Sequence, residues 1–163
     1  MADYNYTVYT DASHNAQHQM AASAFVIINN LTGKIEQGKV NFTNVGTPNM
    51  AERLGVFAAL EKLPKKPGSI IVYCDNQGLM SSLESFTAGG FGVSKKSKKL
   101  DFSEEEIQIL KKTKSRNIQF SWVKGHNGTT LNEVCDKQAR QELRKMIATK
   151  LQKEDGLECL QVY

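Results

Sequence analysis

Four acidic residues occur where the surrounding pattern is apolar. Asp11 and Asp75 each follow a short segment rich in β-branched, aromatic or aliphatic residues, which is typical of a strand. Glu52 and Asp136 each lie on the apolar face of an expected helix. A carboxylate in such a place must be solvated, paired or bound to a cation, because burying it alone costs too much free energy.

Each acid on its own has an ordinary explanation as a turn residue, a cap or a solvated edge. Together they suggest more, because the ends of neighbouring strands line the ligand crevice of an open α/β sheet. Carboxylates that meet there repel and raise one another's pKa, and hard divalent cations such as Mg²⁺ or Mn²⁺ relieve that repulsion. Two such ions roughly 3.5–4 Å apart can activate water and stabilise a leaving oxygen. The acids therefore predict metal-dependent phosphoryl chemistry.

Apolar periodicity indicates which elements position these acids. Strands are predicted over 6–11, 20–28, 34–42, 69–74 and 118–123, the first three forming an antiparallel meander after a polar turn at 13–19. Helices are predicted over 47–63, 77–86, 103–114 and 130 to about 151. Thr47 is expected to cap the first helix, with Pro48 at its first position. The resulting order is β-β-β-α-β-α-α-β-α.

Length and composition favour one soluble globular domain. The 163 residues include 40% hydrophobic and 23% charged residues, with no apolar run of the ~18 residues that a membrane span needs and no signal-peptide pattern. Three cysteines without a C-x-x-C argue against a disulfide scaffold or a zinc site and favour a reducing, cytoplasmic compartment. A net charge of +4 permits a polyanionic partner. We expect a monomer with a catalytic domain over 1–151 and a tail of unassigned structure over 152–163.

The order of elements and several short motifs resemble ribonuclease HI over roughly residues 4–148. The motifs are Thr10-Asp11-Ala12-Ser13, Ala51-Glu52, Cys74-Asp75-Asn76, Trp122-Val123-Lys124-Gly125-His126-Asn127-Gly128 and Asn132-Glu133-Val134-Cys135-Asp136. The resemblance implies a ribonuclease H-like α/β fold, in which a five-stranded mixed sheet with three antiparallel and two parallel strands is flanked by helices. It also implies a two-metal endonuclease that uses Mg²⁺ or Mn²⁺ to cut the RNA strand of RNA–DNA hybrids, giving 5′-phosphate and 3′-hydroxyl ends.

The resemblance also assigns residues. It makes Asp11, Glu52, Asp75 and Asp136 the metal-binding catalytic carboxylates, and His126 a loop histidine that assists proton transfer or product release. The expected substrate contacts are Ser13, Thr47, Asn49, Gln77, Asn132, Lys95, Lys96, Lys98 and Lys99. Amides can donate and accept hydrogen bonds as a 2′-hydroxyl requires, and a helix N-terminus suits a phosphate. Solvated polar side chains remain the alternative for all these contacts.

The chain departs from the family pattern in three places. The loop after Asp11 lacks the usual glycines, the lysine-rich segment 87–100 has no tryptophan, and no separate hybrid-binding domain is expected. A transposase or integrase core would use similar acids, but it would normally need additional DNA-binding domains. A catalytically idle hybrid-binding module would have lost the acids, and all four are present.

Overall fold

The computed structural model describes the chain apart from residues 1–3, 89–101, 115–117, 125–129 and 163. The strands are β1 (Tyr6–Asn15), β2 (Met20–Asn29), β3 (Ile35–Thr43), β4 (Ile70–Cys74) and β5 (Ile118–Trp122). The helices are α1 (Pro48–Glu61), α2 (Gln77–Ala88), α3 (Glu104–Lys114) and α4 (Thr130–Val162). The strands form one mixed sheet in the order β3-β2-β1-β4-β5. Antiparallel pairing joins β1 to β2 and β2 to β3, and parallel pairing joins β1 to β4 and β4 to β5, which confirms the expected fold class.

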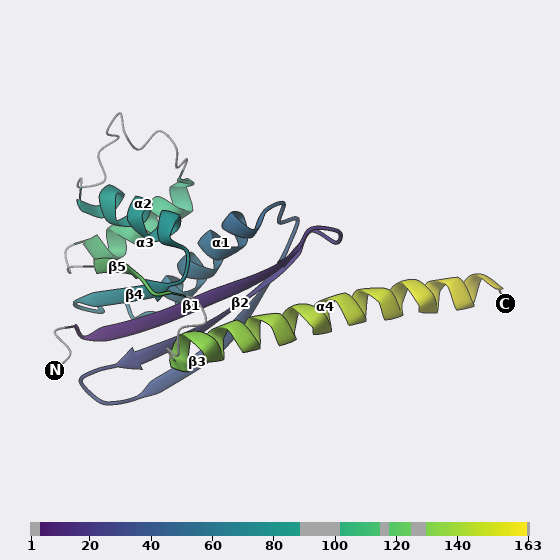
Figure 1. Cartoon of the computed structure of the whole chain (residues 1–163), viewed down its shortest axis with the longest axis horizontal. Coiled ribbons are helices and arrows are strands. Elements are labelled where there is room, and N and C mark those ends of the chain that lie inside the picture. Colours follow the sequence, from purple (N-terminus) through teal and green to yellow (C-terminus); the bar gives the residue numbers. More distant parts are fainter. Residues whose placement is uncertain (1–3, 89–101, 115–117, 125–129, 163) are drawn as a thin grey trace.

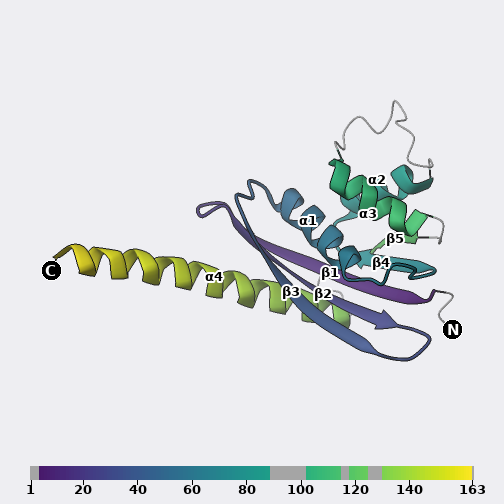
Figure 2. The same cartoon turned by 180° about the vertical axis from the view of Figure 1, so that it is seen from behind.

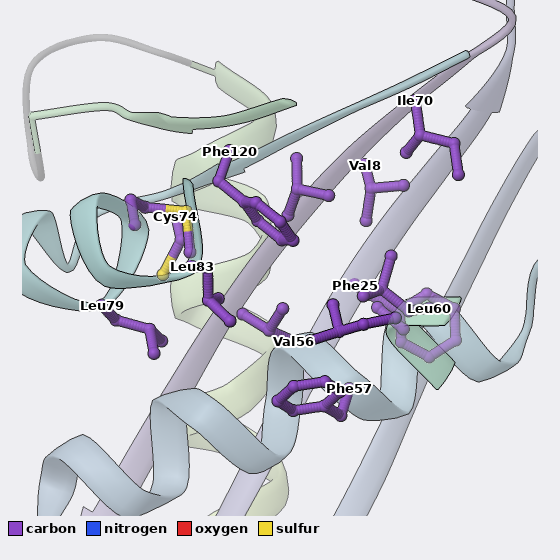
Figure 3. Close-up of a cluster of buried hydrophobic side chains, with 14 of the residues drawn as sticks. Val8, Phe25, Val56, Phe57, Leu60, Ile70, Cys74, Leu79, Leu83 and Phe120 are labelled. Carbon is purple, nitrogen blue, oxygen red and sulfur yellow. The ribbon is translucent and has the colours of Figure 1, made fainter. Parts of the chain in front are cut away.

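Helices cover both faces of this sheet, with α1, α2 and α3 on one side and α4 on the other (Figures 1 and 2). Alternate residues of β2 point to the two faces of the sheet. Phe25 and Ile27 belong to the larger core with α1, whereas Ala24 and Val26 pack against Cys135 and Ala139 of α4. Figure 3 shows part of the larger core, including Val8, Val56, Leu60, Leu83 and Phe120. Burying each such large side chain stabilises the fold by about 1.5–3 kcal/mol.

The first strand is longer than its sequence pattern predicts. We expected it to end at Asp11 and to be followed by a polar turn from Ser13, but β1 continues to Asn15. The reason is tertiary: β2 pairs with β1 along its whole length, so that His14 lies opposite Ala21 and Asn15 opposite Met20. This pairing outweighs the turn preference of the polar residues.

Helix α1 is placed close to the sheet by its cap and by one glycine. Thr47 Oγ1 accepts a hydrogen bond from the Met50 N–H at 3.1 Å, and Pro48 opens the helix, as predicted. A Cβ at Gly55 would lie 2.8 Å from Ser23 Cβ, so a residue without a side chain lets α1 approach β2. Glu52, in the turn between cap and glycine, is thereby held against the sheet.

Helix α4 extends beyond the sheet (Figures 1 and 2). The sequence predicts its end near Leu151, but the helix continues through Gln152 to Val162. The additional segment contains no proline, and its single glycine, Gly156, costs only about 1 kcal/mol relative to alanine. Among the described residues, no helix is long and apolar enough to cross a membrane.

Candidate active site

Asp11 lies deepest among the four acids. It lies opposite Ala24 in the middle of β1 and is 3% exposed, and its Oδ1 accepts a hydrogen bond from the Ala12 N–H at 2.9 Å. The β1–β4 ladder ends at the pair Tyr9–Tyr73, and Asp75 stands two residues beyond Tyr73 as Asp11 stands two beyond Tyr9. Because side chains repeat every second residue along a strand, the two carboxylates project to the same side. The sequence placed both acids at strand ends. Asp75 does follow the end of β4, whereas Asp11 lies within β1 where the partner strand stops.

Glu52 reaches the same place from α1. Its carboxylate accepts a hydrogen bond from the Cys74 thiol, with 3.5 Å between Sγ and Oε2. It also accepts hydrogen bonds from the Asp11 carboxyl group and the Ala12 N–H. Ligand atoms of Glu52, Cys74 and Asp75 all lie within 4.8 Å of one another. The beginning of α1 and the end of β4 therefore bring Glu52 and Asp75 together beside Asp11.

Asp75 is held by the residues around it. Asn76 Oδ1 accepts a hydrogen bond from the Leu79 N–H at 3.0 Å and so caps α2, and its Nδ2 donates to Asn49 Oδ1 at 3.1 Å. The Trp122 indole donates to the Asp75 carbonyl oxygen at 3.2 Å. These bonds join α1, α2, β4 and β5 at one point. The backbone that carries Asp75 is thus fixed by three neighbouring elements.

Asp136 completes the group from α4, on the other side of the sheet. Its Oδ2 accepts a hydrogen bond from Arg140 Nη2 at 2.5 Å, an ion pair between residues one turn apart. Its charge is one of the causes that raise the pKa of Asp11. The structure therefore brings all four predicted carboxylates into one electrostatically coupled cluster.

The cluster is strongly repulsive in the absence of a cation. Burial raises the pKa of Asp11 most, followed by the charges of Glu52 and Asp75. Burial also raises the pKa of Glu52, and the Asp75 charge adds to this effect. Hydrogen bonds from Asp11 and Cys74 act in the opposite direction on Glu52. Both pKa values are raised, so in the cation-free protein the Asp11 and Glu52 carboxyl groups hold one proton between them in their shared hydrogen bond.

Comparison with known proteins agrees with this geometry. The model of the RNase H family matches residues 3–144. The chain belongs to the RNase H family. Ribonuclease H of Helicobacter acinonychis is 32% identical over 117 residues, which cover 71% of this chain and 77% of that protein. Ribonuclease H of Caldicellulosiruptor saccharolyticus is 27% identical over 146 residues, which cover 85% and 96% of the two chains.

Membership of the RNase H family makes the chain a nuclease, and it confirms the resemblance and the enzyme class drawn from the motifs. RNase H enzymes depend on divalent metal ions, and the described residues suit such ions. The negative charges of Glu52, Asp75 and Asp136 raise the pKa of Asp11, so a bound cation would stabilise its ionised form. The carboxylate oxygens are hard ligands. The Cys74 sulfur is a soft ligand, and burial and the Glu52 charge hold the pKa of its thiol well above its ordinary value, so neither property suits Mg²⁺ or Mn²⁺.

The expected substrate contacts of this RNase H fall into different settings. Thr47 and Asn49 line a cavity of about 420 Å³ beside Asn76, at the N-termini of α1 and α2. Gln77 is exposed at the start of α2, and Ser13 is half-buried in β1. Asn132 is 2% exposed, and its Oδ1 has no hydrogen-bond partner in the part of the chain that the structure describes. It lies on α4, one turn before Asp136.

Five predicted residues lie outside the described part of the chain. They are His126 and the lysines Lys95, Lys96, Lys98 and Lys99. Their roles stay predictions that rest on the motif and on charge.

Two residues near the RNase H carboxylates were not predicted. Cys74 is the last residue of β4, and its thiol points toward Glu52 on α1. Arg140 follows Asp136 by four residues, a spacing at which opposite charges pair on a helix. The sequence shows a cysteine before Asp75 and an arginine four residues after Asp136. Both patterns are common in proteins, so only the fold shows that these two side chains contact the carboxylates.

Proposed function

We propose that this chain hydrolyses the RNA strand of RNA–DNA hybrids with two divalent cations, Mg²⁺ or Mn²⁺, leaving 5′-phosphate and 3′-hydroxyl ends. The observation that supports this most is the clustering of Glu52, Asp75 and Asp136 around the buried Asp11 in a chain of the RNase H family. Bound cations would provide a nucleophilic water at neutral pH and stabilise the charge that develops on the phosphate. The four carboxylates would hold them.

Each carboxylate has a distinct part in this proposal. Asp11 and Glu52 share a hydrogen bond and must both be ionised to act as ligands, so cation binding releases a proton. Asp75 and Asp136 come from separate elements, so that a strand end and a helix fix the site from two sides. His126, which precedes α4 in the sequence, assists proton transfer or product release.

The cavity at the N-termini of α1 and α2 supports a nucleic-acid substrate. Backbone N–H groups at a helix N-terminus attract a phosphate, and Thr47 and Asn49 line the cavity there. Ser13, Gln77 and Asn132 are further proposed contacts. Amides such as Asn49 can recognise a 2′-hydroxyl, the group that distinguishes RNA from DNA. The lysines Lys95, Lys96, Lys98 and Lys99 are proposed to contact backbone phosphates.

The test is a cleavage panel. End-labelled RNA–DNA hybrid, double-stranded RNA and double-stranded DNA of one sequence are incubated with the protein in Mg²⁺, in Mn²⁺ and in EDTA. We expect cutting of the RNA strand of the hybrid in either metal and none in EDTA. Products should be labelled by polynucleotide kinase only after phosphatase treatment, as a 5′-phosphate requires. Hybrid that is bound but uncut in both metals would instead indicate an idle binding module, and cutting of double-stranded DNA would indicate a transferase-like enzyme.

A further inference from the structure

Arg140 is the basic side chain that pairs with Asp136. Its Nη2 donates to Asp136 Oδ2 at 2.5 Å, and the side chains of Arg140 and Asp136 are 51% and 22% exposed. Both residues lie on α4, one turn apart. The arginine therefore has room to turn away from Asp136 without any movement of the backbone.

This ion pair competes with the metal chemistry that the site is proposed to perform. Asp136 is one of the carboxylates whose charge acts on Asp11. A cation bound by the cluster would therefore be coordinated by the same carboxylate that pairs with the Arg140 guanidinium. An exposed pair of this spacing is weak, so a divalent cation can replace it readily. Once displaced, the guanidinium remains on α4 one turn from Asp136, beside the proposed cation site.

We propose that Arg140 is a substrate-binding residue that Asp136 holds in the cation-free protein and that turns to an RNA phosphate when cations occupy Asp136. This inference rests on the proposed function. The guanidinium suits the role because its planar fork forms two parallel hydrogen bonds to a phosphate and it is always protonated. Cation binding and hybrid binding are then coupled through one side chain, since the first event releases the group that the second uses.

The test separates cation binding from hybrid binding, and neither measurement depends on turnover. Arg140→Gln is compared with Arg144→Gln, which removes the same charge from an exposed position one turn further along α4. Mg²⁺ affinity of the free protein is measured by titration calorimetry. Hybrid affinity is measured in EDTA and in Ca²⁺, with a gel to verify that the hybrid remains uncut during the titration.

We expect Arg140→Gln to raise Mg²⁺ affinity about twofold, because a weak competitor is gone. In Ca²⁺ its hybrid affinity should fall roughly tenfold, the loss of one charge-assisted contact, whereas in EDTA it should stay close to the parent value. The slope of log affinity against log salt in Ca²⁺ should flatten by about 0.9, and Arg140→Lys should restore most of that slope because the charge returns. Arg144→Gln should show none of these changes, apart from a small loss of hybrid affinity that is the same in EDTA and in Ca²⁺.

Two results would overturn the inference and leave the proposed function intact. One is an unchanged or lower Mg²⁺ affinity of Arg140→Gln, which would mean that the arginine does not compete with the cation. The other is an equal loss of hybrid affinity in EDTA and Ca²⁺, which would make Arg140 an ordinary surface charge. Failure of the parent protein to bind or cut hybrid at all would overturn the inference together with the proposed function.

Discussion

The carboxyl groups of Asp11 on β1 and Glu52 on α1 share a hydrogen bond, so that two acids from different elements hold one proton between them. The proton is retained because burial raises the pKa of both groups, and the charges of the neighbouring carboxylates add to the shift. This relationship makes the state of the site depend on pH and on divalent cations. Both dependences can be measured without substrate.

The first prediction concerns the stability of the cation-free protein. For an acid whose pKa is higher in the folded protein than in the unfolded chain, the folded state binds the proton more tightly. Its contribution is then complete below the unfolded pKa of about 4 and is lost as pH rises through the folded value. Each unit of upward shift corresponds to about 1.4 kcal/mol. The melting temperature in EDTA should therefore fall as pH rises from about 5 toward 9.

Asp11→Asn provides the control for this pH dependence, because an amide keeps the shape and cannot titrate. Its melting curve should vary less with pH, and its melting temperature should exceed that of the parent at alkaline pH. Saturating Mg²⁺ at alkaline pH should stabilise the parent more than the variant. A parent protein that becomes more stable in EDTA as pH rises would contradict the assignment of a shared proton.

The second prediction concerns Asp75. Asp75→Asn removes a charge that is needed to hold a cation, while the backbone stays fixed by Asn76 and Trp122. Hybrid cleavage should be nearly abolished, and the cation-free protein should be equally or slightly more stable because repulsion with Asp11 is relieved. Asp155→Asn, on the exposed part of α4, is the matched control and should cleave normally. A residual rate of Asp75→Asn above about a tenth of the parent value would contradict the role.

The third prediction concerns the glycine that lets α1 approach the sheet. Alanine in a helix is favoured over glycine by about 1 kcal/mol, but a Cβ at Gly55 would lie 2.8 Å from Ser23 Cβ. Overpacking of this kind typically costs about 1–3 kcal/mol, so Gly55→Ala should be destabilising on balance. Gly78→Ala is the control, since its Cβ would meet only Asn76 Oδ1 at 3.7 Å. Urea unfolding should show lower stability for the first variant and not for the second, and Gly55→Ala should also bind Mg²⁺ more weakly because Glu52 is displaced.

The sequence predicts the order of the elements along the chain and the four carboxylates, because periodicity and short motifs are local signals. It does not predict the length of β1, since the pairing of His14 and Asn15 with β2 is a tertiary effect. The predicted end of α4 near Leu151 is too early, because the helix continues to Val162. The segment beyond Leu151 contains no proline and no strong capping pattern, so no local signal marks where the helix ends. These differences leave the cluster unchanged, because β4 ends beside Asp11 whether or not β1 continues.

Side-chain partners are harder to predict than elements. The Cys74 thiol points at Glu52 only because α1 packs on the face of the sheet opposite to α4. Asn132 shares a helical face with Asp136, as predicted, but its burial follows from how tightly α4 packs on β1 and β2. Packing distances of this kind depend on the complete three-dimensional arrangement, and no local pattern encodes them.

The fourth prediction concerns His126. His126→Ala should slow turnover without abolishing it, because a positioned proton-transfer group contributes about 10²–10⁴-fold and water can partly replace it. Mg²⁺ affinity, measured by calorimetry, should be nearly unchanged. His18→Ala is the control, because its ring lies against Lys150 of α4, and it should cleave normally. A large loss of Mg²⁺ affinity in His126→Ala would make this histidine a ligand and contradict its assigned role.

The fifth prediction concerns the four lysines Lys95, Lys96, Lys98 and Lys99. If they contact backbone phosphates, replacing all four with alanine should weaken hybrid binding most at low salt, where counterion release contributes most. The slope of log affinity against log salt should flatten by up to about 0.9 per lost contact. The chemical step, measured in a single turnover with saturating enzyme, should hardly change, because the carboxylates are untouched.

Lys65 and Lys66, exposed after α1, provide a control for net charge. Their replacement with alanine removes positive charge and should leave the salt slope close to that of the parent. If the four-lysine variant binds hybrid as the parent does across the whole salt series, the lysines are solvated and do not contact the substrate. The carboxylate assignment would survive that result, because it rests on the burial of Asp11 and on the charges around it. A slope that flattens by the same amount per removed lysine in both variants would instead show that net charge alone governs binding, which would also contradict specific phosphate contacts.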